Sequence, residues 1–172
     1  MKIFGAIELW RTRFEYRQDT VFNAATYLGF LKQLARRYRR QGAILIQDNA
    51  SYHKDAEVWS WFKSNRHWLE VHQLPPYSPE LNPTERLWQY TRRTGTHNRF
   101  FGGLDALLTT LMRVFAEMQS HPQLIRSCLA PVSLFFVDHH VPLIMRGCIS
   151  QFLKNEMAES AFYDLSAAPE KI

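Results

Sequence analysis

The chain has 172 residues, of which 46% are apolar and 14% are aromatic. This length suits one domain, and this composition is ample for a hydrophobic core, which excludes disorder over most of the chain. The formal net charge of +5 favours a polyanionic partner. Two cysteines, Cys128 and Cys148, make no disulfide framework and have no metal-ligand spacing, so they fit a reducing compartment. No apolar run approaches the roughly 18 residues of a membrane span, and residues 1–9 do not form a secretory signal.

The first predicted elements are a hairpin and a helix. Residues 2–9 and 13–16 resemble a β-hairpin, although the turn between them lacks the favoured glycine or asparagine. Glu8 and Glu15 lie near that turn, so we expect both to be solvated. Apolar residues recur at helical spacing over residues 22–39, which predicts an amphipathic helix with its basic residues outward. Four arginines lie at its end: Arg36, Arg37, Arg39 and Arg40. They either complement the helix dipole or contact a polyanion.

A buried strand is predicted next. The apolar run of residues 43–47 is followed directly by Asp48 and Asn49. Asp48 therefore lies at the carboxyl end of this strand, where open α/β sheets place their ligands. Residues 54–64 then predict a helix, and the alternation over residues 68–74 predicts a further strand.

A turn-rich segment leads into the following helix. Residues 74–84 contain four prolines, and Asn82 and Pro83 are typical of an N-cap and a first helical residue. Glu85 therefore lies in the first turn of that helix. Apolar residues at helical spacing predict a long helix over residues 104–118.

Two long motifs stand out in the middle of the chain. Residues 48–53 read DNASYH, and residues 74–88 read LPPYSPELNPTERLW. In this order and spacing, they resemble the catalytic core of the DDE transposases of the IS630/Tc1/mariner group. The resemblance runs from Lys2 to about Pro131. It implies an α/β, RNase H-like fold, a mixed sheet flanked by helices, in which three carboxylates hold two divalent metal ions, normally Mg²⁺ (or Mn²⁺), for cutting and joining DNA.

The departure from that family concerns the start of the fold. The first carboxylate of the family belongs to an opening strand upstream of the segment that residues 3–7 resemble, and this sequence begins there. We therefore interpret the chain as the distal part of a transposase, either encoded separately or truncated at the N-terminus. It is expected to lack the opening central strand, its Asp and the helix-turn-helix region. That strand would lie between residues 3–9 and residues 43–47. Without it, we expect two unpaired strand edges and low solubility of the chain alone.

The resemblance ends near Pro131, and this point divides the chain into two parts. We assign residues 1–131 to a partial catalytic domain and residues 132–172 to a C-terminal extension of unknown role. Residues 132–138 form an apolar, strand-like run that ends in Asp138. This run either fills the central gap and brings Asp138 to Asp48, or is a hydrophobic tail of foreign or out-of-frame origin.

The resemblance assigns roles to residues in both motifs. Asp48 matches the second carboxylate of the family and Glu85 the third, so Asp48 would share both metal ions and Glu85 would hold one. The simpler alternatives are a turn-forming role for Asp48 and a capping box for Glu85. His53 either orients Asp48, contacts DNA or is a partly exposed polar residue. Asn49 either positions substrate or a water near the metal, or forms a local turn bond.

Arginines surround Glu85 in the sequence. They are Arg86, Arg92, Arg93 and Arg99. We expect them to contact DNA phosphates beside the metal site, which would make binding fall steeply with salt.

The expected function is that of the C-terminal portion of a DDE transposase, which cleaves and joins DNA during transposition when it is joined to its upstream part. The isolated chain is expected to be inactive because the first catalytic Asp is absent. The alternative is a non-catalytic DNA-binding or inhibitory transposase remnant. Expected partners are transposon-end and target DNA, the upstream segment or full-length transposase, and a second copy of the chain, with no membrane. The expected location is the bacterial cytoplasm, at the nucleoid.

Overall fold

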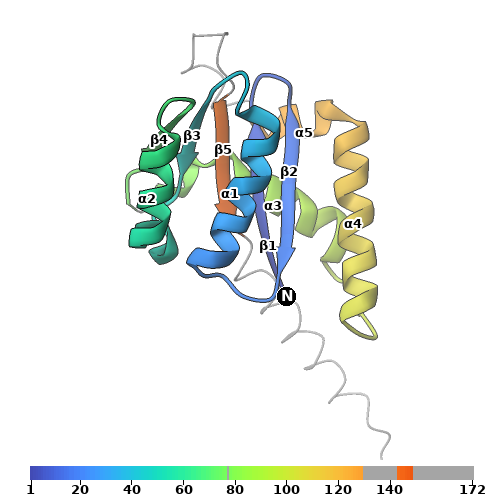
Figure 1. Ribbon diagram of the computed structural model, residues 1–172. Helices are drawn as coiled ribbons and strands as arrows, with labels where there is room; N and C mark the ends of the chain where they lie inside the picture. Colours follow the sequence, from blue (N-terminus) through green and yellow to red (C-terminus); the bar gives the residue numbers. More distant parts are fainter. Residues whose placement is uncertain (77, 130–142, 149–172) are drawn as a thin grey trace, which may run out of the picture.

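A mixed five-stranded sheet with helices on both faces forms the centre of the molecule (Figure 1). The computed structural model describes residues 1–76, 78–129 and 143–148. The strand order is β2-β1-β5-β3-β4, in which β1 is antiparallel to β2 and β5, and β3 is parallel to β4 and β5. The strands are β1 (Lys2–Glu8), β2 (Arg13–Asp19), β3 (Ala43–Gln47), β4 (Leu69–Gln73) and β5 (Leu143–Cys148). This architecture confirms the predicted α/β class.

The helices lie close to their predicted positions. The α-helices are α1 (Ala24–Tyr38), α2 (Ala56–Asn65), α3 (Pro83–Thr91), α4 (Leu104–Ser120) and α5 (Pro122–Leu129). Two short 3₁₀ helices (Ser51–Lys54 and Pro79–Leu81) and a π-helical turn (Arg92–Thr96) accompany them. The sequence predicted neither α5 nor the π turn. No helix among the described residues is long and apolar enough to cross a bilayer.

Two hydrophobic clusters lie on opposite faces of the sheet. Side chains of a strand alternate between its faces, and β1 is buried on both. Ile3 and Ile7 join the cluster of α3, α4 and α5, whereas Phe4 and Ala6 join the cluster of α1 and α2. β1 is therefore an interior strand that both helical layers cover.

The β1–β2 hairpin forms as predicted, and its turn needs no glycine. The Glu8 carboxylate accepts hydrogen bonds from the backbone amides of Trp10 at 3.1 Å and Arg11 at 3.0 Å, and Thr12 adopts a φ of 51°. Glu8 is only 1% exposed as a result. The Glu15 side chain is 14% exposed and pairs with an arginine of α1. The expectation that these two acids are solvated was therefore wrong, because one is used by the turn and the other by an ion pair.

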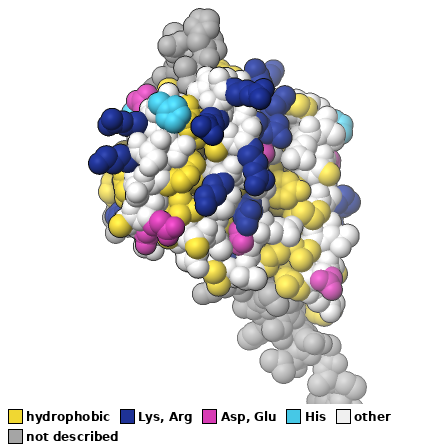
Figure 2. Space-filling model, in the orientation of Figure 1, with side chains coloured by type: hydrophobic (Ala, Val, Ile, Leu, Met, Phe, Trp, Pro, Cys, Tyr) yellow, Lys and Arg dark blue, Asp and Glu magenta, His cyan; other side chains and the backbone are white. Residues whose placement is uncertain are grey.

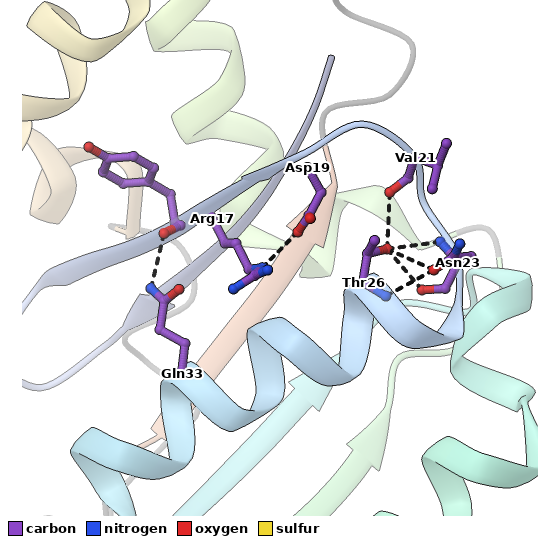
Figure 3. Close-up of polar contacts among 7 residues, drawn as sticks. Arg17, Asp19, Val21, Asn23, Thr26 and Gln33 are labelled. Atoms are coloured by element: carbon purple, nitrogen blue, oxygen red, sulfur yellow. Dashed lines mark hydrogen bonds and ion pairs between the residues drawn. The ribbon is translucent and has the colours of Figure 1, made fainter.

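Polar bonds fix α1 against the edge strand β2. Asn23 caps the helix: its Oδ1 accepts from the Thr26 amide at 2.9 Å, and its amide donates to the Thr26 hydroxyl at 3.1 Å (Figure 3). About two turns beyond Thr26, Gln33 donates from Nε2 to the Tyr16 carbonyl of β2 at 3.0 Å (Figure 3). The basic residues of α1 remain on its outer side, as Figure 2 shows.

The central strand comes from the C-terminal part of the chain. β5 pairs with β1, with Gly147 opposite Gly5, and with β3, with Ile144 opposite Leu45. The sequence assigned these residues to the extension 132–172, yet they fill the position that was expected to be empty. The predicted unpaired edges of β1 and β3 are therefore wrong, and the expectation of low solubility loses its basis. The run 132–138 with Asp138 lies outside the described residues.

Candidate active site

Asp48 follows the last residue of β3, at the carboxyl end of a buried strand. Gln47, which precedes it, is fully buried and accepts a hydrogen bond from the Tyr27 hydroxyl. The Asp48 side chain is 32% exposed, and its Oδ1 accepts from the Ala50 amide at 3.3 Å. Asp48 therefore forms a turn, as the simpler alternative proposed, and its side chain remains partly exposed.

His53 is completely buried behind Asp48. Its Nδ1 lies 2.7 Å from the Asp48 backbone carbonyl and 3.2 Å from Oδ1 of the same residue. Because a carbonyl can only accept, we assign the proton to Nδ1. The imidazole packs between the rings of Tyr27 and Tyr52, each with its centroid 4.6 Å away. This packing fixes the ring beside Asp48, and His53 is fully buried, so the prediction of a partly exposed residue was wrong.

Glu85 lies in the first turn of α3, behind the predicted cap. The Asn82 side chain accepts from the Thr84 amide at 3.2 Å and from the Thr84 hydroxyl at 2.6 Å, and Pro83 is the first helical residue. The amide of Asn82 donates to the Pro79 carbonyl at 3.0 Å. A capping box would require that amide to bond to Glu85. The Glu85 carboxylate is therefore not used in capping.

Asn49 joins the two acid-bearing segments. Its Nδ2 donates to the carbonyl of Leu74, and the Leu74 amide donates to the Gln47 carbonyl at 2.8 Å. The end of β3 is thereby fixed to the start of the proline-rich connector that leads to Glu85. Asn49 thus has a structural bond across 25 residues of sequence and no local turn bond.

The negative charge of Asp48 reaches Glu85. The pKa of Glu85 is raised above its ordinary value, mainly by burial and secondly by the charge of Asp48. The two carboxylates, after β3 and in the first turn of α3, are thus close enough for the charge of Asp48 to act on Glu85. A divalent cation between them would remove the repulsion and favour the ionised form of both groups.

The carboxylate pair fits a single hard cation better than a complete two-ion site. Mg²⁺ is held by one or two carboxylates, waters and substrate phosphates, so Asp48 and Glu85 fit one such ion. Within the described ranges, no three His, Cys, Asp or Glu side chains are grouped as metal ligands. β5 reads LIMRGC and contains no carboxylate, although Arg146 is in register with Gln47.

A hollow of about 700 Å³ opens beside Glu85. Its lining residues are Pro79, Glu85, Arg86, Gln89, Tyr90, Arg93, Ser127 and Cys128. Two of the four predicted arginines, Arg86 and Arg93, therefore share a surface with the carboxylate, and the Arg93 guanidinium lies 6.0 Å from the ring centre of Tyr90. Arg92 is half-buried and Arg99 is exposed, and neither lines this hollow.

A family model described as DDE superfamily endonuclease matches residues 1–108. The chain belongs to this family. It is 36% identical over 101 residues to the insertion element IS630 uncharacterized 39 kDa protein of Shigella sonnei, covering 58% of this chain and 29% of that protein. It is 30% identical over 81 residues to the transposable element Tcb2 transposase of Caenorhabditis briggsae, covering 45% of this chain and 29% of that protein. These matches confirm the resemblance to the IS630/Tc1/mariner group.

This DDE endonuclease chain spans less than a third of the length of either relative. Among solved structures, the catalytic core domain of BIV integrase is similar with a TM-score of 0.38 and 16% identity, over 68% of this chain and 90% of that chain. The family assignment rests on the sequence matches. Membership implies divalent-metal use and a DNA substrate in general terms.

The sequence did not predict that α5 contributes to the hollow beside Glu85. Ser127 and Cys128 of α5 line the hollow beside Glu85. Burial raises the pKa of the Cys128 thiol, and the Ser127 hydrogen bond and the charges of Arg86 and Arg93 partly offset that increase. A signal existed: Pro122 stands at the first helical position, where proline is favoured.

Proposed function

We propose that this chain is the C-terminal portion of a DDE transposase and acts in DNA cleavage and strand transfer when joined to its upstream part. The observation that supports this most directly is the convergence of Asp48 and Glu85, from the end of β3 and the first turn of α3. In this proposal Asp48 shares the divalent ions, Mg²⁺ or Mn²⁺ and two in the complete site, and Glu85 holds one. The ions supply Lewis acidity at the attacking and leaving oxygens of the phosphodiester.

The other residues of the site act on orientation and substrate binding. His53 Nδ1 contacts Asp48 and keeps its carboxylate in one position. Arg86 and Arg93 line the hollow beside Glu85, where guanidinium groups bind backbone phosphates and position the strand. Arg92 and Arg99 remain proposed as more distant phosphate contacts.

In the proposal, the upstream part supplies the third carboxylate of the site. In the proposal, the upstream strand carries it and lies between β1 and β3. β5 occupies that place in this chain and brings no carboxylate. In the proposal, joining the upstream part displaces β5 from the sheet, and activity requires the joined protein. The proposed setting is the bacterial nucleoid, with transposon-end and target DNA and a second copy of the transposase as partners.

A strand-transfer assay tests the proposal. The protein joined to its upstream part is given transposon-end DNA and Mg²⁺ or Mn²⁺. Asp48→Asn and Glu85→Gln should each lower the rate by about 10³-fold or more, as expected for loss of metal-assisted charge stabilisation. Glu57→Gln is the matched control, because Glu57 is an exposed first-turn acid of α2. Full activity of Asp48→Asn, or an equal loss in Glu57→Gln, would contradict the proposed roles.

One observation favours the alternative, a non-catalytic DNA-binding or inhibitory remnant. The chain completes its own sheet with β5, so it can fold without an upstream strand. In that case DNA binding is independent of Mg²⁺ and unaffected by Asp48→Asn with Glu85→Gln, and the chain inhibits full-length transposase in the strand-transfer assay.

A further inference from the structure

A second hollow, of about 520 Å³, lies at the end of the sheet remote from the carboxylate pair. Its lining includes Arg11, Arg13, Glu15, Arg37, Gln119 and Pro122. It is formed where the β1–β2 turn, the end of α1 and the start of α5 meet, at the top of Figure 1. Asp48 follows β3. Along the strand direction, the carboxyl end of β3 is level with the middle of β1, and across the sheet β3 is three strand positions from β2. The two sites are therefore separated by on the order of 15–20 Å.

The charge of this hollow is positive. Three of the lining residues are arginines, and Glu15 is the only lining acid. Arg37 pairs with Glu15 through an Nε–Oε1 contact of 2.7 Å, whereas the charge of Arg13 acts on Glu15 only from a longer distance. Among the described residues, neither Arg11 nor Arg13 has a carboxylate within ion-pair distance, and both are exposed.

The scaffold around Arg11 and Arg13 is fixed by hydrogen bonds. The Arg11 amide is held by the buried Glu8 carboxylate at 3.0 Å. Gln119 of α4 donates from Nε2 to the Phe14 carbonyl at 3.1 Å and so ties the hairpin to the helical layer. The guanidinium groups thus project from a rigid turn, which lowers the entropy cost of binding a ligand there.

The basic surface extends beyond the hollow. Figure 2 shows that Lys and Arg side chains gather over α1 and β2, on the face that this view presents. The exposed ones on these elements and at their ends include Lys32, Arg36, Arg39 and Arg40. A polyanion lying in the hollow would continue along this surface, whereas a small anion would use the hollow alone.

We propose that this hollow binds a backbone phosphate of DNA, as a second contact separate from the metal-binding carboxylates. The inference deepens the proposed function, because it rests on DNA as the substrate, but it makes no use of cleavage. Arg11 and Arg13 supply the binding charge, Arg37 is partly neutralised by Glu15, and the first turn of α5 adds the positive end of a helix dipole.

The proposal is tested by measuring how DNA binding by the full chain depends on salt concentration. A chelator is present, so that loss of strand transfer does not affect the result. A labelled duplex is titrated between about 50 and 200 mM salt. Arg11→Gln with Arg13→Gln should weaken binding at least about tenfold at the lower salt and reduce the slope of log K against log salt by about 2. The matched control is Lys63→Gln with Arg66→Gln, which removes two exposed charges at the end of α2 and should leave the slope unchanged.

Two results would overturn the proposal. The first is an unchanged slope in the Arg11 and Arg13 double variant, or an equal change in the control, provided that circular dichroism shows both variants folded. The second comes from inorganic phosphate added at constant ionic strength. If phosphate raises the melting temperature of the parent chain but not of the double variant, while both bind DNA equally, the hollow takes a free phosphate and the DNA assignment is wrong.

Discussion

The contact between Gly5 and Trp88 determines how closely α3, and with it Glu85, approaches the sheet. A Cβ atom at Gly5 would lie 2.5 Å from Cη2 and Cζ2 of Trp88 and 3.0 Å from Cε2 of Phe14. Trp88 is 4% exposed, and its ring is packed at 5.5 Å from Phe14 and 6.2 Å from Phe115, centre to centre. The indole therefore has no free space into which it can move. Glycine at this position is required by the close approach of the helix.

Gly5→Ala should destabilise the protein by overpacking, at a cost of about 1–3 kcal/mol. A chain of this size loses roughly 2–4 °C of melting temperature per kcal/mol, so a cost of about 1–3 kcal/mol gives an expected decrease of roughly 2–12 °C by circular dichroism. Gly102→Ala is the control, because nothing lies within 4 Å of a Cβ at Gly102. Its effect should stay within about 0.5 kcal/mol.

A second background identifies the cause of the loss. Trp88→Phe removes the part of the indole that carries Cη2 and Cζ2, so Gly5→Ala should cost less in that background, with a coupling of about 1 kcal/mol or more. The reasoning is refuted if Gly5→Ala lowers the melting temperature equally in both backgrounds, or has no effect in either.

Two further predictions concern β5 and Glu85. Removal of residues 130–172 takes away β5 and exposes the inner edges of β1 and β3. Amide exchange in residues 3–8 and 43–47 should therefore accelerate, and cooperative melting should be lost. Unchanged exchange would show that β5 is dispensable. The pKa of Glu85 is raised above 4.5 in the folded protein. The stability that protonated Glu85 contributes is therefore present below pH 4.5 and is lost as pH rises through the pKa of the folded state. Without divalent ions, Glu85→Gln should therefore be more stable than the parent in urea denaturation at about pH 7 and similar to it at about pH 4; a less stable variant at neutral pH would contradict this.

Local signals in the sequence predicted the elements that carry the two carboxylates. The apolar run before Asp48 gave β3, and the Asn82–Pro83 pair gave the start of α3, because a buried strand and a helix cap are specified by neighbouring residues. The same holds for α1, whose apolar spacing is preserved in its buried face.

Long-range pairing could not be predicted in this way. The six residues of β5 carry no sign of their partners, and their central place depends on edges of β1 and β3 more than 90 residues earlier in the chain. Burial of Glu8 was missed for a related reason, because its carboxylate replaces the missing turn glycine by binding two backbone amides. The partnership of Asn49 with Leu74 likewise depends on how two strands lie side by side.

Binding of one divalent cation between Asp48 and Glu85 can be detected through the pKa of Glu85. Carboxyl chemical shifts of Glu85 can be followed by NMR through a pH titration with and without Mg²⁺. We expect a pKa above the ordinary 4.5 without the ion, and a clear decrease when Mg²⁺ is added, which Asp48→Asn abolishes. If Mg²⁺ leaves the titration of Glu85 unchanged in the parent protein, the two carboxylates do not share a cation.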